Sequence, residues 1–250
     1  MAKLDCGSLA DLYGQERGSI LMAERTDRTR EAQEKLRPAR GDRHHLAVEN
    51  RGASPDYARV VENGLSTLPD RIARELDAAG IKVYVFKDIH DYDRAFGTHK
   101  ADLREGKDAP SLFDSSAKPP RIAVFEHLAD GTPVTGFRNY SPAGLARHEV
   151  GHAHDFLNGT LSATDSGFKT TYLDEVRQMP AAKLDQLLQD IGTKSEPGPL
   201  LRYFSGPAKD EFYAELFAMA TGGASDLVAA QRFRYYFPQT VQYMTREYRR

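Results

Sequence analysis

The stretch His148-Glu149-Val150-Gly151-His152 constrains this chain more than any other. On an α-helix, residues four apart lie one turn from each other on the same face. His148 and His152 can therefore direct two imidazoles at one metal ion, and Glu149 can reach a water molecule bound to that ion. The stretch predicts a helix that carries a metal site.

The residues on either side of the motif also predict a helix. Ser141 and Pro142 suit the N-cap and the first helical position, and Asn158-Gly159 offers a stop. A buried amphipathic helix whose histidines only form hydrogen bonds is the alternative interpretation. Apolar residues follow helical spacing at Leu145, Val150, Ala153, Phe156 and Leu157.

Two histidines leave a catalytic zinc site incomplete, because such a site has three protein ligands and one open position. In metzincins, a glycine and a third histidine follow the motif at the positions where this chain has Asp155 and Asn158. The sequence therefore argues against that class. Downstream, Glu211 and Glu215 lie four residues apart beside the apolar stripe of a helix-forming run, 210–218. Burying unpaired carboxylates is costly, and a metal ion with histidine ligands removes that cost. A solvated acidic face is the alternative, but the histidine motif favours a ligand.

The stretches H-E-V-G-H-A-H-D (148–155) and E-F-Y-A-E-L-F (211–217) together resemble the catalytic domain of anthrax toxin lethal factor and its relatives. That family consists of gluzincin-type zinc endopeptidases, and the resemblance covers roughly residues 56 to 250. It implies that His148 and His152 are zinc ligands and that Glu149 is the general base.

The same resemblance assigns four further residues. Glu211 becomes the third zinc ligand, and Glu215 becomes an acceptor that holds a histidine N–H and so fixes its tautomer. Asp155 matches an aspartate of the family and is expected to contact a zinc ligand without binding the zinc itself. Tyr203 is the nearest match to a tyrosine that stabilises the oxyanion.

Composition narrows the class of protein. Hydrophobic residues make up 40% and charged residues 28%, which fits a soluble globular protein. A net charge of −2 argues against a general nucleic-acid binder. The single cysteine, Cys6, excludes an intrachain disulfide. The chain has no apolar run long enough for a membrane span and no apolar signal region at its start. These features fit a cytoplasmic protein or a secreted or translocated effector.

The order of expected elements predicts an α+β, zincin-like fold. Residues 1–55 form a polar extension, partly helical or disordered, and a boundary near 52–55 precedes a metallopeptidase domain over 56–250. A small twisted sheet is expected to pack on the H-E-x-x-H helix, with a polar loop region over 90–118 that can include short helices, and a mostly helical C-terminal half. Strands are expected at 81–86, 121–127 and 134–139, and helices at 56–79, 168–178, 180–191, 209–221 and 225–246.

The last expected strand, 134–139, directly precedes the histidine helix and is well placed to form the sheet edge beside a cleft. An extended peptide can add to such an edge through backbone hydrogen bonds. Val134, Gly136 and Phe137 are therefore the expected substrate-binding residues.

These observations predict a zinc-dependent endopeptidase that acts on a protein or peptide, with Glu149 activating a zinc-bound water. A secreted toxin or effector would fit this prediction. Two alternatives remain open: a zinc hydrolase of a non-peptide amide, and a catalytically inactive interaction domain with a zincin fold. The sequence does not give the oligomeric state.

Overall fold

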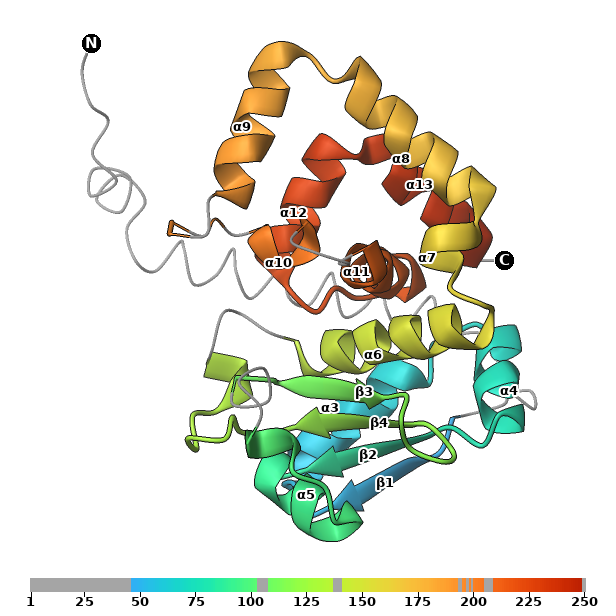
Figure 1. The fold of residues 1–250 in the computed structure, drawn as a ribbon. Coiled ribbons are helices and arrows are strands. Elements are labelled where there is room, and N and C mark those ends of the chain that lie inside the picture. Colours follow the sequence, from blue (N-terminus) through green and yellow to red (C-terminus); the bar gives the residue numbers. More distant parts are fainter. Residues whose placement is uncertain are drawn as a thin grey trace, which may run out of the picture. The chain divides into compact units, whose positions relative to one another are not determined.

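The structure is a computed structural model of the chain (Figure 1). By its internal contacts the chain divides between Arg43 and His44. The described residues all follow this division: 46–102, 108–136, 141–192, 195–196, 198, 200–204 and 209–248.

A four-stranded sheet with the order β1-β2-β4-β3 forms the base of the fold (Figure 1). Strands β1 (Val48–Arg51), β2 (Lys82–Phe86) and β4 (Arg121–Phe125) are parallel to one another. Strand β3 (Ser111–Asp114) pairs with β4 in the antiparallel direction. Strands β1 and β3 are therefore the two edges of the sheet.

Alternation along the strands gives the sheet two apolar faces. Val83 and Val85 of β2 point into the larger hydrophobic cluster, which contains residues of helices α3 (Pro55–Leu65) and α6 (Pro142–Leu157). Phe86 instead belongs to a smaller cluster, which helix α5 (Ile89–Phe96) completes on the other face. Burial on both faces explains why the two central strands are almost entirely apolar.

Two helices, α3 and α4 (Asp70–Ala78), link β1 to β2. The sequence predicted helical residues over 56–79, continuing after Pro69. Ser54 caps α3 by accepting a hydrogen bond from the backbone N–H of Tyr57, and α4 begins after Pro69. Gly80 follows α4 with a φ of +73°, a conformation that glycine adopts without strain, and so ends the helix as predicted.

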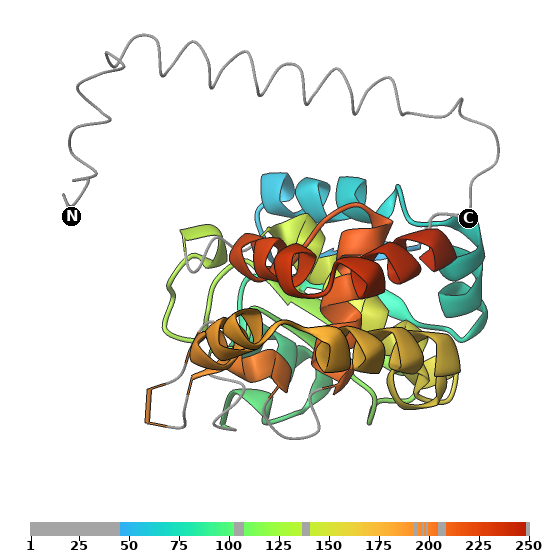
Figure 2. The same cartoon turned by 90° about the horizontal axis from the view of Figure 1, so that it is seen from above.

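The C-terminal half is helical and lies above α6 in Figure 1. Helix α11 (Lys209–Thr221) packs directly on α6, and α13 (Pro238–Tyr248) packs on α11 and on α8 (Ser166–Gln178). In Figure 2, the red C-terminal helices lie beside the yellow-orange helices. The described structure is therefore α+β and mostly helical, as predicted. Its helices beyond α6 are α7 (Leu161–Thr164), α8 (Ser166–Gln178), α9 (Ala181–Ile191), α10 (Leu201–Phe204), α11 (Lys209–Thr221), α12 (Leu227–Tyr236) and α13 (Pro238–Tyr248).

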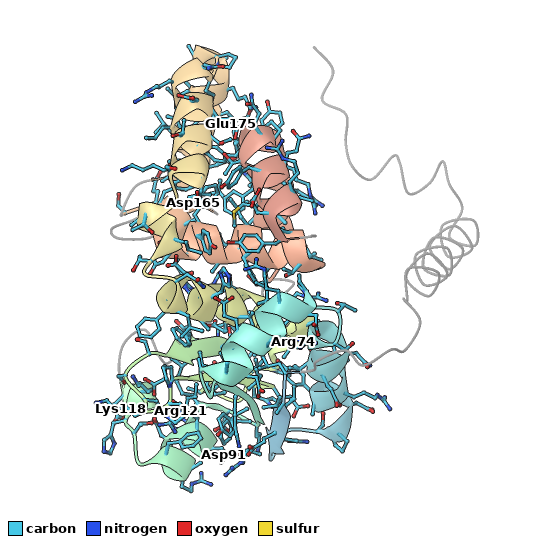
Figure 3. The ribbon with its side chains drawn as sticks, turned by 90° about the vertical axis from the view of Figure 1, so that its right-hand side faces the viewer. Arg74, Asp91, Lys118, Arg121, Asp165 and Glu175 are labelled. Carbon is cyan, nitrogen blue, oxygen red and sulfur yellow. The ribbon has the colours of Figure 1, made fainter. Side chains whose placement is uncertain are left out.

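Two carboxylates labelled in Figure 3 join α8 to α13. Glu175 is buried and accepts hydrogen bonds from the backbone N–H groups of Gln239 and Thr240 at the start of α13. Asp165 caps the start of α8 and also accepts a hydrogen bond from the Tyr243 hydroxyl. Because both carboxylates satisfy helix N–H groups, they fix the registry of the two helices.

Three expectations about secondary structure are wrong. Val134–Gly136 forms a short 3-10 helix, η2, and the remaining residues of the expected strand lie outside the described part of the chain. Strand β3 lies within the expected polar loop, whereas the 3-10 turn η1 (Lys100–Asp102) agrees with the short helices allowed for there. The expected helix 225–246 is two helices, because Pro238 has no N–H to continue α12.

Strand β1 also precedes the expected domain boundary near 52–55 and pairs with β2 throughout its length. Across the described residues, no helix combines the length and the apolar character needed to cross a membrane.

Candidate metal site

Helix α6, which carries the H-E-x-x-H motif, has a capped N-terminus. The Ser141 side chain accepts a hydrogen bond from the backbone N–H of Gly144 at 3.2 Å, and Pro142 occupies the first turn. At the other end Asn158 is the C-cap, and Gly159 follows with a φ of +73°. The start and stop signals in the sequence are both confirmed.

Three donor atoms converge above α6. The Nε2 atoms of His148 and His152 lie 3.1 Å apart. Each lies 3.3 Å from a different carboxylate oxygen of Glu211, which α11 brings in from the other side. These three residues form a group that could hold a metal ion, with all donor atoms within 4.8 Å of one another.

The spacing of these atoms is close to that of donors around a zinc ion. With zinc–nitrogen and zinc–oxygen distances near 2.1 Å, neighbouring donors of a tetrahedron lie about 3.4 Å apart. The two nitrogens lie 3.1 Å apart, and each lies 3.3 Å from its own oxygen of Glu211, so a carboxylate oxygen faces each imidazole. Two imidazoles and one carboxylate are also a donor set that zinc takes in hydrolases, with a fourth position left open.

Glu215 supports the first histidine from the side away from this group. It is completely buried, and its Oε2 lies 3.1 Å from Nδ1 of His148. It also accepts hydrogen bonds from the backbone N–H and hydroxyl of Ser225 and from the backbone N–H of Asp226. A carboxylate held in this way directs the His148 Nε2 lone pair toward the metal position.

Electrostatics in the group favour a proton on His148 when no metal ion is bound. Burial alone would lower the pKa of His148, but hydrogen bonds to Glu211 and Glu215 raise it to about 10. Burial would raise the pKa of Glu211, whereas hydrogen bonds from His148 and His152 hold it well below its usual range. Without a metal ion the carboxylates therefore retain a proton on His148, and a bound cation would take its place.

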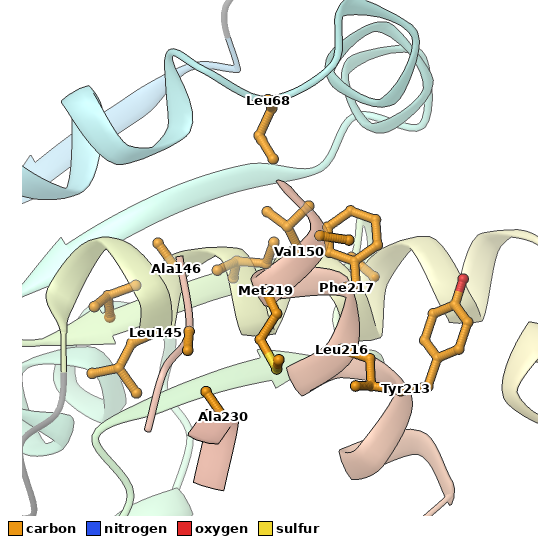
Figure 4. Packing of buried hydrophobic residues seen from close by; sticks show 14 of the residues in the cluster. Leu68, Leu145, Ala146, Val150, Tyr213, Leu216, Phe217, Met219 and Ala230 are labelled. Atoms are coloured by element: carbon orange, nitrogen blue, oxygen red, sulfur yellow. The ribbon is translucent and has the colours of Figure 1, made fainter. Parts of the chain in front are cut away.

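Small residues allow α6 and α11 to approach closely. A Cβ atom at Gly151 would lie 2.8 Å from Cα of Ala214 and 3.2 Å from Cβ of Phe217. One at Gly144 would overlap the carbonyl oxygen of Ala224. Figure 4 shows the apolar contact beside these glycines, where side chains of α6 such as Val150 pack against α11. This close contact places Glu211 and Glu215 within reach of the histidines.

Glu149 lies beside the donor group but makes its own contact with the sheet. Its side chain is largely buried, with 6% of the residue exposed. Its Oε1 accepts a hydrogen bond of 2.7 Å from the hydroxyl of Ser111, the first residue of edge strand β3. Sequence reasoning missed Ser111, because it placed this segment in a polar loop.

Two further predicted residues are buried in other contacts. Asp155 accepts hydrogen bonds from the backbone N–H and hydroxyl of Ser162, and burial raises its pKa. Tyr203, in α10, is 1% exposed, and its ring packs edge-on against Phe233 at 4.8 Å between centroids. A supporting role for Asp155 and an oxyanion role for Tyr203 stay predictions.

Of the expected substrate-binding residues, Val134 and Gly136 do not belong to a strand. Val134 is fully buried in the hydrophobic core, and Gly136 ends the 3-10 helix η2. Phe137 lies outside the described residues.

His154, two residues after His152, is buried and contacts Tyr213 and Glu75 instead of the donor group. Only 2% of it is exposed, and its ring stacks on Phe217 at 5.5 Å. Burial lowers the pKa of His154 to about 4, against the opposing charge of Glu75.

No protein-family model matches the sequence, and no curated protein does. Among solved structures, the fold is similar to that of the Pro-Pro endopeptidase PPEP-2 from Paenibacillus alvei. The TM-score is 0.50 at 16% sequence identity, and the alignment covers 80% of this chain and 97% of that one. At this identity the likeness shows the fold alone, and the chemistry has to be argued from the residues.

Proposed function

We propose that this protein is a zinc-dependent endopeptidase of the lethal factor-like type. The observation that carries the proposal is the convergence of His148, His152 and Glu211 on one point, with Glu149 adjacent and hydrogen-bonded to an edge strand. The similarity in fold to an endopeptidase adds support.

Each residue has a distinct part in the proposed reaction. His148, His152 and Glu211 would hold the zinc ion, which supplies a positive charge that polarises the scissile carbonyl and acidifies a water molecule. Glu149 takes a proton from that water and passes it to the leaving amine. Glu215 keeps the His148 ring oriented throughout.

The substrate path is proposed along β3 instead of the expected segment 134–139. Among the described residues, strand β3 is an edge of the sheet and pairs only with β4, so its outer backbone groups can accept an extended peptide. Ser111 at its start contacts Glu149, which supports a reacting bond near that end. A peptide paired with β3 would therefore pass directly beside the base.

An aromatic pair lies further along the same path. Phe113 of β3 contacts Phe156 of α6 edge-on, with ring centroids 5.7 Å apart. Phe156 is 49% exposed, which is unusual for a phenylalanine. Since Ser111 and Phe113 are two residues apart, they share a face of the strand and lie about 7 Å apart. We propose that the pair receives an apolar substrate side chain about two residues from the scissile bond.

Strand β3 and Glu149 also help to distinguish the proposal from the two alternative functions. A hydrolase of a small non-peptide amide would use the same ligands but has no need for an open strand beside the base. An inactive interaction domain has no need for a carboxylate held next to the donor group, because Glu149 contributes no ligand atom to the group.

Metal content and cleavage of a peptide library test the proposal together. The purified protein should carry about one zinc ion per chain. Glu149→Gln should retain the metal and the fold but lose activity by about 10²- to 10⁴-fold, because the base acts only in the transition state. A protein that takes up no zinc, or a variant that keeps wild-type turnover, would refute the assignment.

The proposed path has a separate test in the cleavage profile. Phe156→Ser should weaken the preference for an apolar residue at one substrate position without changing metal content. Val60→Ser, at a 45% exposed position on α3, is the matched control and should leave the profile unchanged. A profile that does not respond to Phe156→Ser would place the substrate elsewhere.

A further inference from the structure

Ser111 and Glu149 are joined across the boundary between the sheet and helix α6. The hydroxyl of Ser111 donates to Oε1 of Glu149 at 2.7 Å, although the two residues are 38 positions apart in the sequence. Serine has one O–H to donate, and an O–H bond to an ionised carboxylate is stronger than one between neutral groups.

This hydrogen bond engages one oxygen of the carboxylate and leaves the other free. Within the described part of the chain, no hydrogen bond reaches Oε2 of Glu149. The glutamate side chain has three rotatable bonds, and its terminal torsion is broad and soft. A fixed donor at Oε1 therefore restricts which oxygen is presented to a reacting group.

The donor itself is held by the backbone of the sheet. Ser111 pairs with Val124 in the antiparallel ladder, and the N–H of Phe125 donates to the carbonyl of Pro110 at 3.0 Å. Strand and helix are both rigid elements, so the separation between the hydroxyl and the carboxylate is set by the packing of the fold. Such prior orientation lowers the cost of reaching the reactive geometry.

We propose that Ser111 is a positioning residue that holds the carboxylate of Glu149 by Oε1, so that Oε2 is the oxygen that takes the proton. This inference rests on the proposed function, because it concerns the base of that reaction. It also links the base to the proposed substrate strand, since Ser111 belongs to both.

The contact is tested first by carbon NMR of the metal-free protein labelled with ¹³C in the glutamate carboxylates. The Glu149 resonance is the one absent from Glu149→Gln. We expect Ser111→Ala to shift or broaden this resonance and Ser111→Thr to restore it, because threonine keeps the hydroxyl and suits a strand. An unchanged resonance in Ser111→Ala would overturn the proposal.

Kinetics then test the positioning role. In Ser111→Ala, kcat should fall by about 10- to 100-fold, the cost typical of losing an orienting contact, while KM and zinc content stay near wild type. Ser111→Thr should recover most of the lost rate. A loss confined to KM would overturn the proposal, because it would show that Ser111 binds substrate instead.

Ser54→Ala is the matched control. Ser54 also donates to a glutamate, at 2.6 Å to Oε1 of Glu126, but away from the donor group. Its loss should lower thermal stability and leave kcat and the Glu149 resonance unchanged. If Ser54→Ala lowers kcat as much as Ser111→Ala, the effect is general destabilisation and the proposal fails. If the wild-type protein cleaves no peptide, the proposed function fails and the NMR result alone decides the contact.

Discussion

Glu211 and Glu215 are the same residue type one helical turn apart, yet the structure gives them different surroundings. Glu211 is partly exposed and reaches both histidines, whereas Glu215 is fully buried and bonds to His148 and to the start of α12. The spacing of the two glutamates predicted that both would lie at the metal site. Which of them is the ligand and which the supporting residue came from the family resemblance, because the spacing does not distinguish them.

Removing each glutamate should therefore have unequal effects on metal binding. Glu211→Ala removes a donor atom and should lower zinc affinity by more than the 10- to 100-fold that is typical for loss of a supporting contact such as Glu215→Ala. Glu215→Ala should also lower thermal stability, because it leaves buried donors of Ser225 without an acceptor. Titration against a competing chelator measures both affinities. A larger loss of affinity in Glu215→Ala would reverse the assignment.

The pKa of His148 predicts opposite pH trends for the metal-free and metal-loaded protein. Its folded pKa is raised from 6.5 to about 10, so protonation stabilises the metal-free fold below about pH 6.5. That contribution is lost as pH rises toward 10, while zinc affinity rises because less proton has to be displaced. Thermal unfolding with and without zinc, from pH 6 to 10, checks both trends.

His148→Asn serves as the control, because it cannot titrate in this range. The difference in stability between this variant and the metal-free wild type should shrink as pH rises. A difference that does not vary with pH would contradict the raised pKa.

Not every residue of the site was visible in the sequence. The histidines and Glu149 form a compact motif, and the carboxylates repeat at helical spacing. Ser111 belongs to no such pattern, because its contact with Glu149 depends on how the sheet edge lies against α6. A contact set by tertiary packing leaves no local signal.

At the scale of elements, periodicity predicted the long and buried pieces well. Helices α6 and α11 and strands β2 and β4 have continuous apolar faces and were found close to their expected bounds. Both edge strands were missed. Each has four residues, Val-Glu-Asn-Arg and Ser-Leu-Phe-Asp. A short edge strand that is only partly buried has few apolar residues, so its sequence gives a weak strand signal.

The contact between α6 and α11 gives a prediction that runs against helix propensity. In an isolated helix, Gly151→Ala would stabilise by up to about 1 kcal/mol. Here the added Cβ would press on the backbone of Ala214, so the helices must separate and carry Glu211 away from the histidines. We expect a lower melting temperature together with weaker zinc binding.

Calorimetry and chelator titration of Gly151→Ala test this directly. A variant that is more stable than wild type, with unchanged zinc affinity, would show that the helices can adjust without cost.

At the scale of the whole molecule, strand β1 lies before the expected start of the metallopeptidase domain. The boundary near 52–55 was inferred from a change in polarity, but β1 lies before it and Leu46 is buried in the main core. The chain divides by contacts between Arg43 and His44. Strand β1 is polar and half-exposed, so the compositional change does not coincide with the edge of the fold.

Two truncations distinguish these boundaries. A chain that begins at His44 should unfold cooperatively and bind zinc with an affinity like that of the full chain. One that begins at Asp56 lacks β1 and Leu46, which uncovers one edge of β2 and part of the core, and it should be markedly less stable. Thermal unfolding of both fragments decides; equal stability would support the later boundary.

Glu215 has a consequence for how the site can be observed. The carboxylate that orients His148 also accepts the amide protons of Ser225 and Asp226 at 3.0 and 3.3 Å, and Asp226 is the N-cap of α12. Arrival of an ion at the histidine would polarise this carboxylate and alter both amides, although neither touches the ion. Their NMR resonances would then act as reporters of occupancy that require no substrate and no added label at the site.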